Sequence, residues 1–183
     1  MTVFRTLKCV TLLFLSFGFL GCTFGPSPQS LQADPSATPT LETARTVFED
    51  RTRITHDPWY GTQIEYHRSD GKSFLWFPRN TRPVPANWEV RNHGFGQGGH
   101  EICWQYPSTS KNAVTGAKGG NWECYPDSTY NANLTAVLQG DPFDLASNRV
   151  PFRIPSTRKY SAENLMTTAK RDPTNLRYIY RKQ

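Results

Sequence analysis

The sequence predicts a mainly β fold with short helices (α+β), arranged as an antiparallel β meander or a small, partly open barrel stapled by one disulfide. Segments that alternate apolar and polar residues recur between Trp59 and Tyr125, and turn residues separate them. The same region contains an even pair of cysteines, Cys103 and Cys124. It also contains all five tryptophans of the chain: Trp59, Trp76, Trp88, Trp104 and Trp122. These three observations favour a compact β domain with a covalent link between two strands.

A short helix is expected at the start of this domain, over residues 40–52. Thr40 can cap the helix, and Glu42 lies in its first turn. The residues that share one apolar stripe are Leu41, Ala44, Val47 and Phe48. The helix is short, so we expect it to pack onto a larger element, and Asp57-Pro58 ends any helix.

Three strands are expected next. Residues 62–67 alternate, with Ile64 and Tyr66 on one face and the polar Gln63, Glu65 and His67 on the other. The sequence Ser69-Asp70-Gly71 is a tight-turn signal, and residues 72–77 supply the return strand. After an irregular link that contains three prolines, residues 87–91 alternate again.

The last two strands of the block, residues 101–106 and 121–125, flank a polar loop and form a hairpin. If Cys103 lies opposite Cys124, then Gln105 lies opposite Trp122 on the same face and Trp104 pairs with Glu123 on the other. This register needs no bulge. The hairpin and the disulfide therefore support each other.

The segments after residue 126 are expected to contain short helices and extended pieces. Residues 133–138 are expected to form a single helical turn. Residues 150–154, beside Pro151 and Pro155, are expected to be extended, at an edge if they join a sheet at all. A short helix is predicted over residues 161–170 with Ser161 as its cap, and a final strand over residues 176–180.

The N-terminus has the order of a secretory signal. Arg5 and Lys8 precede an apolar run over residues 9–20, and Gly21-Cys22 closes it. The run is too short to span a membrane. Cleavage after Gly18 as an ordinary secretory signal is the open alternative. The polar, proline-rich residues that follow cannot bury enough apolar surface to fold.

The end of this signal resembles the lipobox of bacterial lipoproteins. The resemblance implies acylation at Cys22 and, because Thr23 follows rather than Asp, an outer-membrane location facing the periplasm. The expected organisation is a signal peptide over residues 1–21, a lipidated flexible tether over residues 22–39 and a single β-rich domain with a basic C-terminal segment over residues 40–183. In that oxidising compartment, Cys103 and Cys124 are expected to form a disulfide.

A second resemblance covers roughly residues 59–126. It rests on Gly61-Thr62, Glu65-Tyr66, Asp70-Gly71, Trp76, Trp88-Glu89-Val90, Ile102-Cys103-Trp104 and Trp122-Glu123-Cys124. This pattern is similar to that of small exported domains of alphaproteobacteria whose function is uncharacterised. It implies a compact β domain with a paired cysteine and carries over no catalytic residue.

Basic charge is concentrated at the C-terminal end. From Asp141 onward the chain holds nine Lys and Arg against four acids, a net charge of +5. The segment that ends in Arg177, Arg181 and Lys182 is therefore a candidate for binding anionic lipid, lipopolysaccharide or cell-wall glycan. A solvated tail without a partner is the alternative, and location argues against nucleic acid.

Catalytic signals are weak. His93 and His100 bracket a glycine run, and with Glu101 they could bind a metal if the loop folds back, but the spacing matches no established zinc pattern. No cofactor is expected. We therefore expect a protein that binds or scaffolds something at the membrane or cell wall, and exposed aromatic side chains could stack on sugar rings. The alternative is an envelope hydrolase or metal-dependent enzyme that uses His93, His100 and Glu101.

Overall fold

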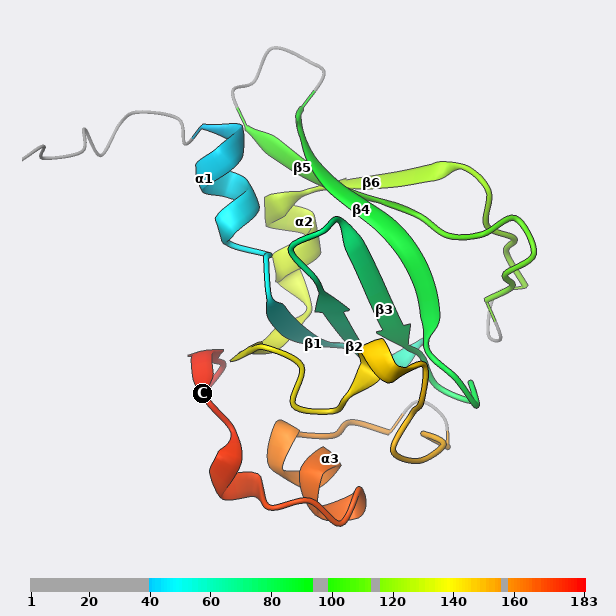
Figure 1. The fold of residues 1–183 in the computed structure, drawn as a ribbon, viewed down its shortest axis with the longest axis vertical. Coiled ribbons are helices and arrows are strands. Elements are labelled where there is room, and N and C mark those ends of the chain that lie inside the picture. Colours follow the sequence, from blue (N-terminus) through cyan, green and yellow to red (C-terminus); the bar gives the residue numbers. More distant parts are fainter. Residues whose placement is uncertain (1–39, 94–98, 113–115, 156–157) are drawn as a thin grey trace, which may run out of the picture. The chain divides into compact units, whose positions relative to one another are not determined.

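The computed structural model describes residues 40–93, 99–112, 116–155 and 158–183. Its eight antiparallel strands form one sheet in the order β6-β5-β4-β3-β2-β1-β7-β8. The sheet curls into a half-barrel (Figure 1). The strands are β1 (Arg51–Asp57), β2 (Gly61–His67), β3 (Lys72–Trp76), β4 (Val84–Asn92), β5 (His100–Gln105), β6 (Trp122–Pro126), β7 (Leu134–Gln139) and β8 (Tyr178–Arg181). The predicted fold class, mainly antiparallel β with one disulfide, is confirmed.

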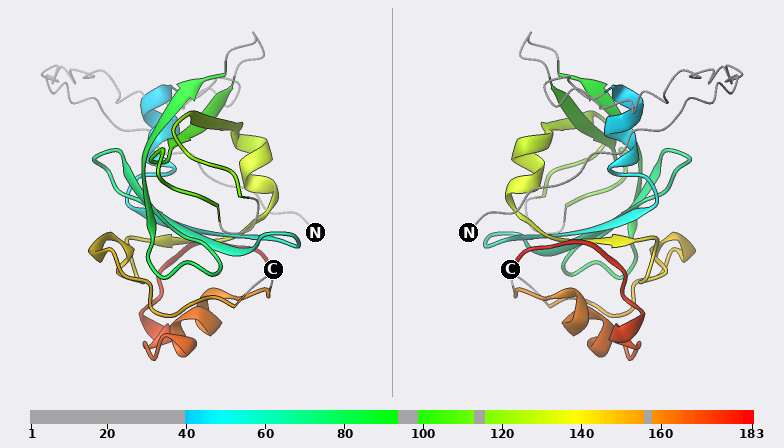
Figure 2. Two further views of the ribbon diagram at one scale, coloured as in Figure 1. Left: turned by 90° about the vertical axis from the view of Figure 1, so that its right-hand side faces the viewer. Right: turned by 90° about the vertical axis from the view of Figure 1, so that its left-hand side faces the viewer.

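Three short α-helices accompany the sheet in the described part of the chain: α1 (Leu41–Thr46), α2 (Asp127–Ala132) and α3 (Ala162–Thr168). Single 3₁₀ turns lie at Leu145–Ser147 and Pro173–Asn175. The helix α3 and the C-terminal segments lie on the opposite side of the sheet from α2 (Figure 2). None of the helices described has the length and apolar character needed to cross a bilayer.

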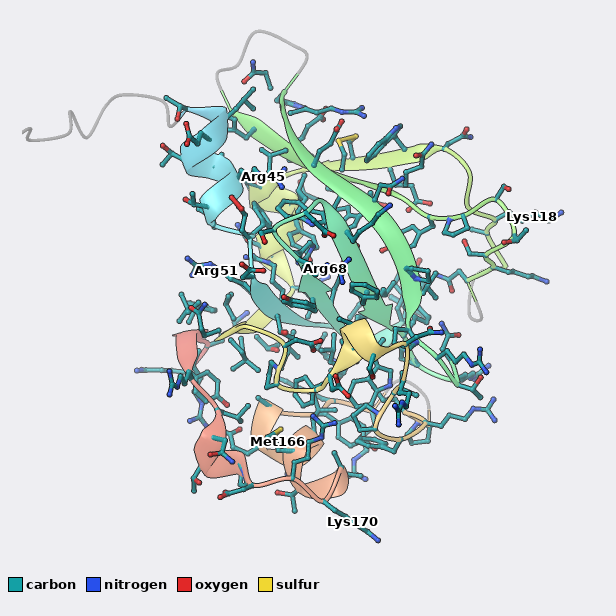
Figure 3. The ribbon with its side chains drawn as sticks, in the orientation of Figure 1. Arg45, Arg51, Arg68, Lys118, Met166 and Lys170 are labelled. Atoms are coloured by element: carbon teal, nitrogen blue, oxygen red, sulfur yellow. A yellow bond between two sulfur atoms is a disulfide. The ribbon has the colours of Figure 1, made fainter. Side chains whose placement is uncertain are left out.

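Strand alternation gives the sheet two faces with different cores. The α3 face, here also called the outer face, carries Ile54, Ile64 and Trp76, which are fully buried and pack in one cluster with Leu165 and with Met166 of α3 (Figure 3). The opposite face, here called the inner face, carries Trp88, Ile102 and Trp104, which pack with Phe48. Strands β1, β2, β3 and β7 contribute to the core on the α3 face, whereas β4 and β5 contribute to the core on the inner face. Aromatic side chains in both cores account for the high aromatic content of residues 59–125.

The first helix is shorter than predicted, and β1 was missed. Thr40 caps α1 as expected, since its Oγ1 accepts a hydrogen bond from the Thr43 amide at 3.2 Å. The helix nevertheless ends at Thr46, and Asp50 adopts a left-handed conformation with φ of 49° immediately before β1. The strand was hidden because its inner-face positions hold charged residues, Arg51 and Arg53, instead of apolar ones.

The prediction of a helical turn over residues 133–138 was also wrong, because Leu134–Gln139 is strand β7. Most of this strand is buried, so its sequence is a nearly continuous apolar run without alternation. Such a run cannot be distinguished from a buried helix by periodicity. The helical turn lies just upstream, in α2.

The hairpin register was predicted correctly. Cys103 pairs with Cys124, Trp104 with Glu123 and Gln105 with Trp122, and the two cysteines form a disulfide. Ser161 caps α3, since its Oγ accepts from the Asn164 amide. The final strand β8 pairs with β7, whereas the segment 150–154 lies outside the strands, with Ile154 buried.

Candidate ligand-binding pocket

The curled inner face encloses a pocket of about 560 Å³. Its lining comes from strands that are distant in the sheet, β1, β2 and β3 on one side and β5 and β6 on the other, together with α2. Only the concave face of a curled sheet can bring these strands around one space. The lining residues on which the argument depends are Arg53, Glu65, Trp104, Tyr106, Tyr125 and Tyr130.

Glu65 is a buried carboxyl group in the wall of this pocket. Its Oε1 accepts hydrogen bonds from Ser73 Oγ at 2.8 Å and from the Tyr106 hydroxyl at 3.3 Å. Burial raises the pKa of Glu65 to about 7, although these hydrogen bonds and the charge of Arg53 act to lower it. The carboxyl group is therefore poised between its neutral and charged forms near neutral pH.

Arg53 lies directly across the β1–β2 ladder from Glu65 and is only 3% exposed. Its guanidinium carbon is 4.7 Å from the centre of the Phe48 ring and 5.1 Å from that of Tyr130. The Nη2 atom donates a hydrogen bond to Asn131 Oδ1. The Nε atom is buried without a hydrogen-bond partner among the described residues. Burial lowers the pKa of Arg53.

His67 is buried between Glu65 and the Phe48 ring. Its Nε2 accepts a hydrogen bond from Trp104 Nε1 at 3.1 Å, and its ring packs edge-on against Phe48 and Trp88. Burial lowers the pKa of His67 well below its usual value, so the ring is neutral. The 3.7 Å between His67 Nε2 and Glu65 Oε2 is thus neither a hydrogen bond nor an ion pair.

The mouth of the pocket is aromatic and polar. Tyr60 and Tyr125 line it and are 39% and 45% exposed. Asp57 shapes the β1–β2 turn that carries Tyr60, because its Oδ1 accepts from the amides of Trp59 and Tyr60 at 2.7 and 3.1 Å. Lys118, on the segment between β5 and β6 (Figure 3), also lines the pocket.

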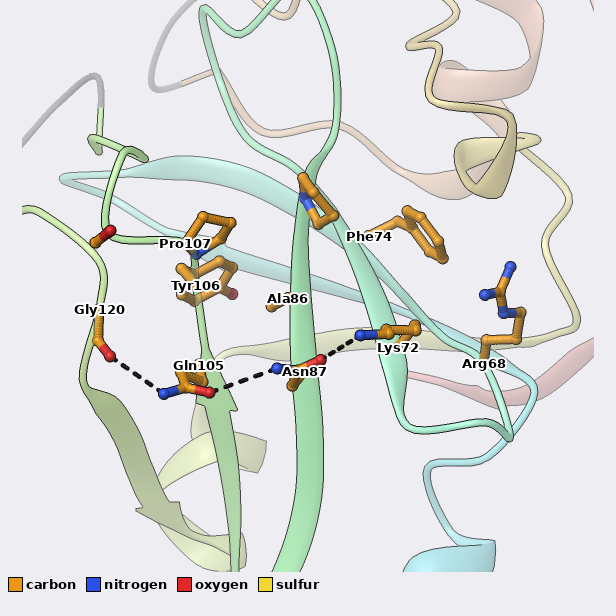
Figure 4. A pocket seen from close by; sticks show the side chains of 11 residues that line it. Arg68, Lys72, Phe74, Ala86, Asn87, Gln105, Tyr106, Pro107 and Gly120 are labelled. Carbon is orange, nitrogen blue, oxygen red and sulfur yellow. Dashed lines mark hydrogen bonds between the residues drawn. The ribbon is translucent and has the colours of Figure 1, made fainter.

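A second hollow of about 630 Å³ lies on the outer face of β3, β4 and β5 (Figure 4). Its polar side chains are joined in a row: Lys72 donates to Asn87, Asn87 to Gln105, and Gln105 to the Gly120 carbonyl. The guanidinium of Arg68 at its rim is paired with Asp70 at 2.7 Å. Because these groups already satisfy one another, the inner pocket is the stronger candidate site.

The sequence-predicted metal or hydrolase residues do not converge. His93 Nδ1 and Glu101 Oε2 are 3.4 Å apart. His100 precedes Glu101 in β5, so its side chain points to the inner face and that of Glu101 to the outer face. The glycine run over residues 94–98 lies outside the described residues. Glu101 is near Cys103 and Cys124, but a disulfide leaves no thiolate for a metal.

The other predicted site residues do not line the pocket or lie outside the described part. Cys22, the signal peptide and the tether belong to residues 1–39, which the structure does not describe. The disulfide lies on the outer face, because Cys103 and Cys124 alternate with the inner-face Trp104 and Glu123. In the basic segment, Arg181 is 3.0 Å from the Glu163 carboxylate and its guanidinium lies over the Tyr178 ring, whereas Lys182 is exposed.

Sequence reasoning missed the pocket residues. It placed Glu65 and His67 on the polar face of β2, but that face is buried inside the half-barrel. Tyr130 was missed because α2 was not predicted. The available signal was a set of charged residues, Arg51, Arg53 and Glu65, that alternate with the buried residues Thr52, Ile54, Ile64 and Tyr66.

The chain matches no family model, and no curated protein or solved structure is significantly similar to it. The functional argument therefore rests on the geometry of the pocket.

Proposed function

We propose that this chain is a bacterial envelope lipoprotein whose half-barrel binds a small sugar-like ligand in the inner pocket. The single observation that carries the proposal is the pocket itself, which combines buried ionisable groups with aromatic faces. Its volume, about 560 Å³, lies within the range of about 300–1,000 Å³ typical of small-ligand sites. A fold stabilised only by its core has no need of a hollow lined by Arg53 and Glu65, because burying ionisable groups is costly.

The lining suits a polar ring. Trp104, Tyr125 and Tyr130 offer aromatic faces, and the Tyr106 hydroxyl and the Glu65 carboxyl offer hydrogen-bonding groups. A ligand with apolar ring faces and hydroxyl groups along its edges uses both kinds of surface. Sugars of the cell wall have this chemistry, and an envelope protein meets them at high local concentration.

The proposed location rests on the signal that ends at Gly21-Cys22. Two or three acyl chains at Cys22 would hold the protein firmly in the membrane, whereas a single chain binds only marginally. The tether over residues 22–39 would let the half-barrel reach outward from the bilayer. Binding is preferred to hydrolysis because His93, His100 and Glu101 do not face one space.

The test is a titration of the full mature chain, with Cys22→Ser as its soluble form, with a soluble disaccharide of N-acetylglucosamine and N-acetylmuramic acid. Binding is followed by the Trp104 indole Nε1–H signal in two-dimensional NMR. Tyr125→Ala, on the inner face of β6, should weaken binding about fivefold, since one lost stacking contact costs about 1 kcal/mol. Trp122→Ala, on the outer face of the same strand, is the matched control and should leave affinity unchanged.

Saturable shifts of the Trp104 signal that depend on Tyr125 support the proposal. The absence of any shift at millimolar sugar, or equal effects of the two substitutions, would overturn it.

A further inference from the structure

We infer that Arg53 forms an anion-binding subsite in the half-barrel, so that the ligand is an acidic sugar: a pyranose ring that carries a carboxylate. This inference rests on the proposed function and specifies its ligand. It starts from the charge of Arg53, which the protein itself leaves uncompensated at close range.

The guanidinium of Arg53 is buried without an anionic partner in the described part of the chain. Arg53 is 3% exposed, yet no carboxylate of the described residues lies within ion-pair distance of it. Its neighbours are the Phe48 and Tyr130 rings and the neutral amide of Asn131. A buried cation without a paired anion is a costly arrangement that proteins maintain mainly where a ligand or partner supplies the charge.

The nearby acids, Glu65 and Asp127, do not pair with Arg53. Glu65 faces Arg53 across the ladder, but its Oε1 is bonded to Ser73 and Tyr106. The pKa of Glu65 is raised despite the proximity of Arg53, so Glu65 neutralises the guanidinium only in part. Asp127 of α2 is close enough for the charge of Arg53 to act on its pKa. Its Oδ1 nevertheless has no hydrogen-bond partner among the described residues.

The charges of the pocket lining favour an anion with a single negative charge. Arg53 lies in the pocket wall, and the other cations of the lining, Lys111 and Lys118, are on the segment between β5 and β6. The wall also holds Asp57, Glu65 and Glu123, which would repel a doubly charged group. These acids repel a carboxylate too, but they repel the second charge of a phosphate in addition, so the single guanidinium of Arg53 fits a carboxylate better.

The experiment compares two ligands of the same shape on the wild-type pocket. N-acetylmuramic acid and its methyl ester differ in the charge of one group, and each is titrated into the full mature chain carrying Cys22→Ser. Charge-assisted hydrogen bonds predict that the acid binds about tenfold more tightly than the ester, or better. Arg53→Met should reduce this ratio to about one.

Arg91→Met is the matched control, since Arg91 lies on the outer face of β4 over the Trp122 ring. It should keep the preference for the acid. If Arg53→Met does not fold, Arg53→Lys takes its place, because lysine keeps the charge but loses the planar fork of the guanidinium. It should lower the acid-to-ester ratio, and a ratio equal to that of the wild type would overturn the assignment to Arg53.

The outcomes separate the two proposals. Equal binding of acid and ester overturns the anion subsite but leaves sugar binding in place. A preference that survives Arg53→Met overturns the assignment to Arg53. Failure of both ligands to bind removes the proposed function, and the inference falls with it.

Discussion

Replacing Glu65 by Gln should change how the stability of the protein depends on pH. Glutamine keeps the size of the side chain and an oxygen that can accept from Ser73 and Tyr106, but it cannot ionise. Burial raises the pKa of Glu65 from 4.5 to about 7. At 1.36 kcal/mol per pKa unit, this shift corresponds to about 3 kcal/mol of free energy of unfolding.

The direction follows from proton binding. Between pH 4.5 and about 7, the folded protein holds a proton on Glu65 that the unfolded chain releases. The contribution of Glu65 to stability is therefore complete below pH 4.5 and is lost as the pH rises through about 7. Relative to the Gln variant, the wild type should lose up to about 3 kcal/mol between about pH 5 and pH 8.

The assay is urea denaturation of both proteins, with the disulfide intact, at several values of pH between about 5 and 8. Other buried groups such as His67 titrate in both proteins, so the difference between them isolates Glu65. Parallel pH profiles for wild type and Glu65→Gln would refute the reasoning and would mean that the carboxyl group stays ionised in the folded state.

Three further predictions concern other parts of the chain. Cys22→Ser should abolish acylation and release the protein into the soluble fraction; metabolic lipid labelling that persists in this variant would contradict the anchor. Replacing Cys103 and Cys124 by serine should lower the free energy of unfolding by about 3 kcal/mol, measured by urea denaturation, since their sequence separation is 21 residues; a loss below about 0.5 kcal/mol would show that the disulfide constrains little. Reversing the charges of Arg177, Arg181 and Lys182 should weaken sedimentation of the unlipidated protein with anionic vesicles at about 0.1 M salt, while about 1 M salt should remove the difference; equal binding of the two proteins at low salt would identify the segment as a solvated surface.

The parts of the fold that were predictable are those with local signals. The β5–β6 hairpin follows from strand parity around Cys103 and Cys124, and the starts of α1 and α3 follow from Thr40 and Ser161 as caps. Strands β1 and β7 were missed because neither alternates in the usual way. One places arginines inside the half-barrel, and the other is buried along most of its length.

The candidate pocket was not predictable for a related reason. Arg53 and Glu65 lie opposite each other on adjacent strands, but Trp104 and Tyr130 join them around one space only because the sheet curls and α2 packs on its inner face. The local sequence does not predict the curvature of a sheet. The alternation of β2 predicted a polar face. Whether this face is exposed to solvent or buried inside the half-barrel depends on pairings between distant strands.

The central claim, that the inner pocket binds a sugar, is tested most directly by isotope-filtered nuclear Overhauser measurements on the complex with N-acetylmuramic acid. The account predicts contacts from the ring protons of the sugar to the aromatic protons of Trp104 and Tyr125. Contacts instead to Phe74 and the side chain of Gln105 would place the ligand in the outer hollow and contradict the account.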